Sequence, residues 1–345
     1  MTKTNAIITR RGALAAMTAA SLAPLLPSRL AAKSFYRMST LGPGTTPNLV
    51  MTTFATLVNK VLPEHEIQVN ATGAATKHML EVGAGKTDFC MSSPTVMFLM
   101  SNGKAMYKKI KQAPDLSKNI RMLFNFPMGM YHIVVYADSG IESLMDVKGK
   151  RVFLGPPGGA ALRTMTLLFE SVTGYKAGED FEVAKLGWDS AAQAFQDKNI
   201  DVYCNPTNPP SPVISQVAVS NEIRMLGIPE DALAKPEVAK LAKRPGFRFT
   251  QMPPDAYGEA QVNTTPENTL AITVGMSTNK DLPDDAIYEM LKAFWVGLED
   301  IKAEAPWMQP ISTGTALADM NAVLHPGAVR YYEEIGMTIP DELKP

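Results

Sequence analysis

The strongest constraint on the fold of this 345-residue chain is the order in which short apolar runs, glycine-containing turns and amphipathic helices follow one another. A strand predicted over residues 34–41 leads into a turn, and apolar residues then recur at helical spacing as far as Val61. The same order returns as a strand over 66–71 and a helix over 76–83. This alternation predicts an α/β fold with a largely parallel sheet. Such sheets bind ligands beyond the carboxyl ends of their strands, where loops and helix starts meet.

Two predicted helices have clear starting signals. Thr46 is expected to be the N-cap of the first helix, with Pro47 at its first position. A strand over 151–154 precedes the glycine-rich loop 155–159, after which a helix is expected to begin near Ala160. The loop lacks both the GxGxxG spacing of a dinucleotide site and the Gly-Lys-Ser/Thr of a phosphate loop. No cofactor is therefore expected.

A weak internal repeat relates residues 80–100 to residues 194–214. In both segments a helix ends, an acidic residue opens a short buried strand, and a polar turn follows. Two generic strands with ordinary turn chemistry would explain the similarity equally well. The two strands contain the only cysteines, Cys90 and Cys204, which we expect to be free thiols, although the sequence leaves a disulfide between them open.

Two β-branched apolar runs, 131–136 and 270–276, each suit an interior strand. If they run side by side, the chain crosses there between two lobes. The first lobe would then combine residues 33–130 and 275–345, and the second lobe would be the inserted segment 131–274.

The first 32 residues have the composition of an export signal. Lys3, Arg10 and Arg11 precede a mildly apolar, alanine-rich run, and no acidic residue occurs before Glu64. The paired arginines favour a twin-arginine signal, cleaved near Ala32, over a Sec signal; a helical or structureless N-terminal tail is the alternative. The run is too short to span a bilayer, so no stable membrane insertion is expected, and the predicted location is the periplasm.

The charge balance excludes one class of partner. Residues 1–32 hold four of the 33 basic residues and none of the 34 acidic ones, so the net charge changes from −1 to −5 without them. Nucleic-acid binding needs a basic excess on one face, and is not expected here.

No catalytic or metal-binding constellation is recognisable. The four histidines show no metal-ligand spacing, there is no Gly-x-Ser-x-Gly elbow, and neither cysteine has a neighbouring base. Glu64, His65 and Glu66 follow Pro63 and favour a solvated surface turn over a metal site. We therefore expect no catalytic residue and no metal.

Two cations near predicted helix starts point to an anion. Lys77 and Arg163 each follow a glycine-containing loop, where a positive charge opposes the helix dipole unless an anion is bound. The alternative is that they face solvent and pair with Glu81 and Glu170. Trp188 and Phe126 could supply an apolar wall, with core packing as the alternative for both.

Several motifs together resemble a known family. They are Gly-Thr-Thr-Pro at 44–47, Ala-Thr-Gly-Ala-Ala-Thr-Lys at 71–77, Gly-Lys-Thr-Asp-Phe at 85–89, the segment 141–152 with its following glycine loop, and the ending His-Pro-Gly-Ala-Val-Arg-Tyr-Tyr at 325–332. In this order they resemble the TAXI-type solute-binding subunits of TRAP transporters, and the ending is the most specific match.

The resemblance implies a type II periplasmic-binding-protein fold: two α/β lobes around a cleft, joined by hinge strands. It implies a protein without catalysis that captures a small solute and delivers it to the small and large TRAP membrane subunits. The implied cleft loops are 42–48, 72–76, 92–95, 155–161 and 205–209. The ligand-binding residues expected from it are Gly44, Thr45, Thr46, Asn48, Thr72, Gly73, Ala74, Ala75, Thr76, Ser92, Ser93, Gly158, Gly159, Ala160, Arg163, Asn205, Thr207 and Asn208.

Departures from the family pattern bear on the ligand. Family members commonly have an aromatic residue where Thr46-Pro47 stands here. Hydroxyls and carboxylates common in the other loops are lost at Ala74-Ala75, at the turn 92–94 and in the segment 158–162. Without these groups the sequence gives less support for a ligand with an ammonium group, such as an amino acid. It still supports a carboxylate ligand held by helix-start N–H groups and by Arg163 or Lys77. A carboxylate or amino-acid-like anion is the expected solute. An exported hydrolase-like enzyme and a periplasmic sensory protein are the alternative functions.

Overall fold

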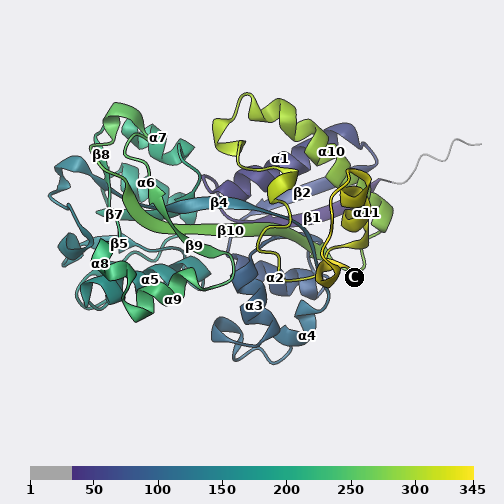
Figure 1. Cartoon of the computed structure of the whole chain (residues 1–345), viewed down its shortest axis with the longest axis horizontal. Coiled ribbons are helices and arrows are strands. Elements are labelled where there is room, and N and C mark those ends of the chain that lie inside the picture. Colours follow the sequence, from purple (N-terminus) through teal and green to yellow (C-terminus); the bar gives the residue numbers. More distant parts are fainter. Residues whose placement is uncertain (1–32) are drawn as a thin grey trace, which may run out of the picture. The chain divides into compact units, whose positions relative to one another are not determined.

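The computed structural model describes residues 33–345, which form one compact unit. The predicted export signal at 1–32 lies outside the described residues. Two long strands, β4 (Ile120–Tyr136) and β10 (Glu267–Asn279), run through the middle of this unit with helices gathered around both of their ends (Figure 1). None of the helices between residues 33 and 345 is both long and apolar enough to cross a membrane.

The strands form one mixed sheet in the order β2-β1-β3-β10-β4-β7-β5-β6, with β8 added to β4 and β9 added to β10. We call β2, β1 and β3 with their helices the first half, and β7, β5 and β6 with their helices the second half.

In the first half the three strands are parallel, as the alternating sequence pattern predicts. Their bounds are β1 (Ser34–Thr40), β2 (His65–Ala71) and β3 (Phe89–Ser92). The helices of this half are α1 (Thr46–Val61), α2 (Ala75–Gly83), α3 (Pro94–Ser101), α4 (Ala113–Ser117), α10 (Asp284–Lys302) and α11 (Pro326–Glu334).

In the second half β5 likewise lies between two parallel neighbours. The strands are β5 (Arg151–Phe153), β6 (Glu182–Val183), β7 (Val202–Thr207), β8 (Ile223–Met225) and β9 (Phe247–Met252). The helices are α5 (Ala160–Thr173), α6 (Trp188–Gln196), α7 (Pro212–Ala218), α8 (Glu230–Leu233) and α9 (Pro236–Ala242).

The two long strands connect the halves. They pair antiparallel from Ile120 opposite Asn279 to Met130 opposite Ala271, and β4 then continues beside β7 and β8. The two runs singled out in the sequence do not pair with each other, because residues 271–276 lie opposite residues 130 to 124. The run 131–136 itself lies beyond that shared stretch, against the strands of the second half. The lobe boundaries proposed from sequence remain a prediction.

The weak sequence repeat corresponds to a repeated structural brace. Asp88, just before β3, accepts a hydrogen bond from the backbone N–H of Arg37 in β1 at 2.7 Å. Asp201, just before β7, accepts one from the backbone N–H of Arg151 in β5, also at 2.7 Å. In each half an aspartate thus ties the start of one parallel strand to its neighbour, which ordinary turn chemistry alone would not produce twice.

Each half has its own aromatic core. Phe124 stacks on Phe294 in the first half, with ring centroids 5.0 Å apart. Tyr136 stacks on Phe195 in the second half, with centroids 4.8 Å apart. Burying such rings is a large apolar contribution, and stacking adds about 0.5–1.5 kcal/mol per pair. Phe126 lies fully buried next to Phe124, so it belongs to the core and not to a ligand wall.

One helix start differs by a residue from its prediction. Thr45, not Thr46, is the N-cap of α1, and its side chain accepts a hydrogen bond from the N–H of Asn48. Thr46 is instead the first helical residue. Its hydroxyl is left available for a contact described below.

Candidate functional site

A cavity of about 70 Å³, which we call the chamber, lies where the loops of the two halves meet. From the first half it is lined by the start of α2, the end of β3 and the start of α3, and from the second half by the loop 156–161 and by α6. Residues of β4 and β10 complete the wall. Its lining residues are Leu41, Ala74, Ala75, Met91, Ser93, Thr95, Val96, Met128, Tyr131, Pro156, Gly159, Ala160, Ala161, Trp188, Pro206, Phe247, Ile272 and Val274.

Side-chain hydrogen bonds between the halves close the chamber. Thr76, at the start of α2, donates to the carbonyl oxygen of Gly158 at 3.2 Å. The hydroxyl of Thr46 lies 3.3 Å from that of Thr207 and also accepts from the N–H of Asn208 at 3.2 Å. Thr95 on α3 donates to the carbonyl oxygen of Pro245 at 2.6 Å. The loops predicted to face each other therefore touch, and the structure is in a closed arrangement.

One side of the chamber adjoins a cationic cavity of about 440 Å³, which we call the basic mouth. It shares Thr95 and Ala160 with the chamber. Arg163, Lys243 and Arg244 lie in its wall opposite apolar residues of α3. No Asp or Glu side chain is among the described residues that line either the chamber or the basic mouth.

The arginines of the basic mouth have no ion-pair partner within residues 33–345. Arg244 is half-buried and donates one hydrogen bond to the hydroxyl of Thr164 at 3.1 Å. Burial lowers the pKa of Arg244 from its ordinary value, and the neighbouring charge of Arg163 lowers it further. Two adjacent like charges without a counter-charge favour a bound anion electrostatically.

The other side of the chamber adjoins a cavity of about 470 Å³ with a different charge pattern. Lys77 and Asp189 lie in its wall together with the loops 71–74 and 156–158. Lys77 pairs with Glu81 at 3.5 Å. For Lys77, pairing with Glu81 was the alternative to anion binding. This second mouth has no uncompensated excess of positive charge comparable with the basic mouth.

The chamber also contains hydrogen-bond donors without acceptors. Tyr131 is 2% exposed, and its hydroxyl makes no hydrogen bond to any residue the structure describes. Burial raises the pKa of this hydroxyl, while the positive charge of Arg244 acts in the opposite direction. The indole N–H of Trp188, another wall residue, is likewise buried without an acceptor among the described residues. Buried hydrogen-bond donors normally have acceptors, and a ligand with acceptor oxygens would supply the acceptors that these two donors lack.

Five of the residues predicted to bind ligand line the chamber itself: Ala74, Ala75, Ser93, Gly159 and Ala160. Three more, Thr76, Thr46 and Thr207, make the closing contacts. Thr72, Gly73 and Gly158 line the second mouth, and Arg163 lines the basic mouth.

The remaining predicted residues support the loops and line none of these three cavities. Thr45 caps α1, and Asn48 donates to the carbonyl oxygen of Leu41 at 3.2 Å. Ser92 is fully buried in β3. Asn208 donates its amide to the carbonyl oxygens of Pro127 and Trp307. The other two are Gly44, which packs against Val213, and Asn205, which donates to the Tyr203 hydroxyl.

The proposed pairing of Arg163 with Glu170 is wrong. The carboxylate of Glu170 accepts a hydrogen bond from the N–H of Ala177 at 3.1 Å and holds the turn after α5. Arg163 is exposed at the basic mouth and does not line the chamber.

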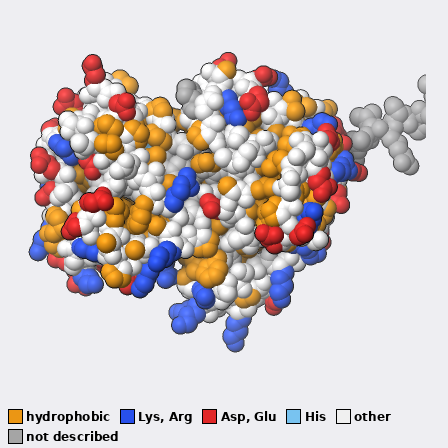
Figure 2. All heavy atoms as spheres, in the orientation of Figure 1, with side chains coloured by type: hydrophobic (Ala, Val, Ile, Leu, Met, Phe, Trp, Pro, Cys, Tyr) orange, Lys and Arg blue, Asp and Glu red, His pale blue; other side chains and the backbone are white. Residues whose placement is uncertain are grey.

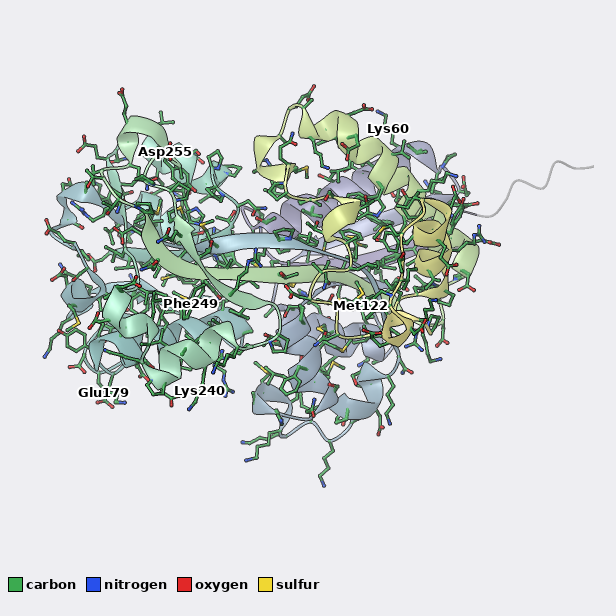
Figure 3. The ribbon with its side chains drawn as sticks, in the orientation of Figure 1. Lys60, Met122, Glu179, Lys240, Phe249 and Asp255 are labelled. Atoms are coloured by element: carbon green, nitrogen blue, oxygen red, sulfur yellow. The ribbon has the colours of Figure 1, made fainter. Side chains whose placement is uncertain are left out.

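Sequence reasoning missed the cations and donors that distant segments contribute. Lys243 and Arg244 follow α9, and Tyr131 lies in β4. Figure 2 shows Lys and Arg side chains gathered along the lower side of the visible face, where α3, α4 and α9 lie in Figure 1. Figure 3 shows Lys240 on α9 at the edge of the unit, about one turn before the segment that reaches the basic mouth. No local motif marks these residues, because only the tertiary structure brings them to the chamber or to the basic mouth.

The predicted surface turn after Pro63 covers only Pro63 and Glu64. His65 and Glu66 already lie in β2, and His65 is 9% exposed and packs edge-on against Tyr36. Lys33 pairs with Glu66 at 2.6 Å and lowers its pKa. Glu64, His65 and Glu289 come close enough to share a cation, with His65 Nε2 lying 3.7 Å from Glu289 Oε2. None of these residues lines the chamber.

The thiols lie in the two repeated strands and are inert in character. Cys90 and Cys204 are free and fully buried. Burial raises the pKa of Cys90 to about 12 and raises that of Cys204 further. Neither residue has the lowered pKa of a catalytic thiol.

The arrangement identifies the fold. An α/β sheet with two long crossing strands and a cavity between two sets of loops is the fold class predicted from the sequence, which is confirmed. A solved structure described as a periplasmic transporter is similar with a TM-score of 0.51 and 17% identity, over 87% of this chain and 92% of that one. This likeness concerns the fold alone.

The chain belongs to the NMT1-like family, which matches residues 38–336. More distant structural similarity extends to the alkanesulfonate-binding protein SsuA from Xanthomonas axonopodis pv. citri bound to MOPS, with 14% identity and a TM-score of 0.45 over 88% of this chain and 84% of that one. It also extends to DctP7, a Bordetella pertussis extracytoplasmic solute receptor binding pyroglutamic acid, with 15% identity and a TM-score of 0.43 over 88% of this chain and 92% of that one.

Proposed function

We propose that this chain is an extracytoplasmic solute-binding protein that encloses a small organic anion between its two halves. The observation that supports the proposal most directly is the chamber itself, whose wall comes from both halves and whose edges are closed by hydrogen bonds between them. A mostly apolar cavity with a few converging polar groups is the usual form of a small-molecule site. The residues proposed for the site are those of the cleft loops together with Tyr131, Arg244 and Arg163.

Binding would act through closure. A ligand that touches both halves gains contacts only when they approach, and this difference in affinity is what shifts an open–closed equilibrium. The chain crosses between the halves in β4 and β10, so these strands are the proposed hinge. Gly129 in β4 has a φ of +106° and lies against the carbonyl of Thr207. The backbones of β4 and β7 are therefore packed closely together at this residue.

We further propose export to the periplasm by the signal at 1–32 and delivery of the solute to the small and large TRAP membrane subunits. The TAXI-like motifs and the binding-protein fold support this assignment. A sensory role would use the same closure without transport. Solute uptake into proteoliposomes that hold the TRAP subunits distinguishes the two, because a sensory protein would bind the solute and leave uptake unchanged.

Thermal stability in the presence of candidate solutes tests the binding function. We expect a saturable rise in melting temperature for organic anions, with the solute recovered unchanged as judged by mass spectrometry. Consumption of the solute would contradict the proposal and favour an exported enzyme.

A matched pair of variants locates the site. Ala74→Leu at the start of α2 fills the chamber and should abolish the stabilisation. Ala84→Leu introduces the same side chain just after the end of the same helix, at an exposed position outside the chamber, and should leave it intact. Equal behaviour of the two variants would exclude the chamber as the site.

A further inference from the structure

The chamber and the basic mouth are neighbouring cavities with chemically distinct linings, and they share Thr95 and Ala160 in their walls. The chamber wall is made largely of Ala, Met, Val, Ile, Pro and aromatic side chains. The mouth adds three cations. A molecule that spans them would therefore need an apolar body at one end and a negative charge at the other.

The groups that would hold the charge lie on the two sides of this shared wall. Tyr131 lines the chamber and is 2% exposed, and its hydroxyl makes no hydrogen bond within residues 33–345, while Arg244 lines the basic mouth. Arg163 adds a second unpaired guanidinium beside Arg244. Carboxylates and sulfonates accept hydrogen bonds from such groups in pairs, and these charge-assisted bonds are the strong ones.

The same wall offers nothing for a positive charge. Within residues 33–345, no carboxylate lines the chamber or the basic mouth. The second mouth has Asp189, but Lys77 lies in the same wall. An ammonium group in the apolar chamber would be desolvated without a counter-charge, which is costly.

We propose that the solute is an organic monoanion with a small apolar body and no ammonium group, such as a branched or aromatic carboxylate or sulfonate. Its anionic head accepts hydrogen bonds from Tyr131 and Arg244, with Arg163 nearby, and its apolar body fills the chamber. This assignment rests on the proposed binding function and narrows it. The protein should bind simple organic acids and should bind the corresponding amino acids weakly.

Matched solute pairs test the assignment on the purified full chain. Isothermal titration calorimetry would compare 4-methyl-2-oxopentanoate with leucine, 2-oxo-3-phenylpropanoate with phenylalanine, and 4-methylpentanoate with its uncharged amide. We expect the acid of at least one pair to bind, and its ammonium-bearing or uncharged counterpart to bind at least about tenfold more weakly. Tighter binding of the amino acids overturns the assignment while leaving a solute-binding function in place. Absence of binding by every solute of the panel also overturns the assignment, and a wider screen without any saturable ligand would overturn the proposed function as well.

Substitutions on the two sides of the shared wall give a second readout. Arg244→Gln and Tyr131→Phe should each weaken the acid about tenfold or more and reduce its preference over the uncharged amide. Arg330→Gln, on α11 and paired with Asp285 away from these cavities, is the matched control and should leave both values unchanged. The opposite result is that both variants still bind the acid more tightly than the amide while melting near the temperature of the parent chain. That result would show that Arg244 and Tyr131 do not form the anion site.

Discussion

The two halves of the molecule share a framework but differ in the chemistry they present. Both place a central strand between two parallel neighbours, and both brace the next strand with an aspartate, Asp88 or Asp201. Toward the chamber, however, the first half contributes small and apolar side chains, whereas the cations of the basic mouth come from the second half. The framework common to both halves therefore braces the sheet, whereas the positive charge beside the chamber comes from segments outside that framework.

The largest expected effect concerns the glycines of the crossing strands. A Cβ at Gly129 would meet the backbone carbonyl oxygen of Thr207 at 2.0 Å, at a φ of +106°. A Cβ at Gly275 would first meet the Asn125 side-chain oxygen at 2.1 Å, and the Phe124 carbonyl oxygen only at 2.8 Å. Gly129→Ala should therefore reduce the free energy of unfolding by about 3 kcal/mol, and Gly275→Ala by less. Urea denaturation of both variants measures the loss of unfolding free energy. Equal losses would show that β4 and β10 tolerate an added Cβ equally well at these positions.

Acid should destabilise the β4–β7 contact. Burial lowers the pKa of His132 from 6.5 to about 4, so the folded state resists protonation that the unfolded chain accepts. The stabilisation is complete above about pH 6.5 and is lost as the pH falls toward about 4, at up to about 1.4 kcal/mol per pH unit. Burial also lowers the pKa values of His78 and His325 in the first half, which adds to the loss in the same direction.

The variant His132→Gln separates these contributions. It should have a shallower decline of unfolding free energy between pH 7 and pH 5 than the parent chain, as measured by urea denaturation at each pH. An unchanged slope would assign the acid sensitivity to the first-half histidines.

The repeated aspartate brace predicts matched effects in the two halves. Asp88→Ala and Asp201→Ala each leave the N–H of a neighbouring strand, that of Arg37 or Arg151, without its acceptor. Each should cost about 1–2 kcal/mol of unfolding free energy and leave solute affinity within about twofold. Chemical denaturation and calorimetry check the two values. A loss confined to one half would show that the repeat is only a likeness of sequence.

The smallest effect is expected at the closing contacts. Thr76→Val removes the hydrogen bond to the Gly158 carbonyl while keeping the side-chain shape. It should weaken solute binding by about 0.5–1.5 kcal/mol, because the bond exists only when the halves are closed. Thr173→Val is the control, since its hydroxyl donates to the Phe169 carbonyl oxygen within the second half and Thr173 lines none of the three cavities. Equal affinities of the two variants would mean that Thr76 does not favour closure.

Much of the fold follows from local patterns. The strand–turn–helix order predicts β1, α1, β2 and α2 to within one or two residues, and the second glycine loop predicts the start of α5 at Ala160. The C-terminal motif also has a local reason: His325 caps α11, Pro326 begins it, and a Cβ at Gly327 would meet the carbonyl oxygen of Asp284 at 2.3 Å. That motif therefore supports helix packing rather than a ligand.

The site was only partly predictable. The family resemblance implied Ala74, Ser93 and Gly159, and they line the chamber because loops that follow parallel strands gather at one edge of a sheet. Arg244 was not implied, because the segment after α9 reaches the basic mouth through tertiary packing rather than through strand order.

What the sequence determined by itself is the layered α/β architecture and the set of loops that face each other, since both depend on periodicity and turn chemistry over short stretches. The tertiary structure alone decided which charges lack partners and which donors lack acceptors. Glu170 turned away to hold a backbone N–H, while Arg163 came beside Arg244 and Tyr131 was buried without a partner within residues 33–345. Such electrostatic and hydrogen-bonding relations depend on distances between residues far apart in the chain, and those distances exist only after the halves have packed together.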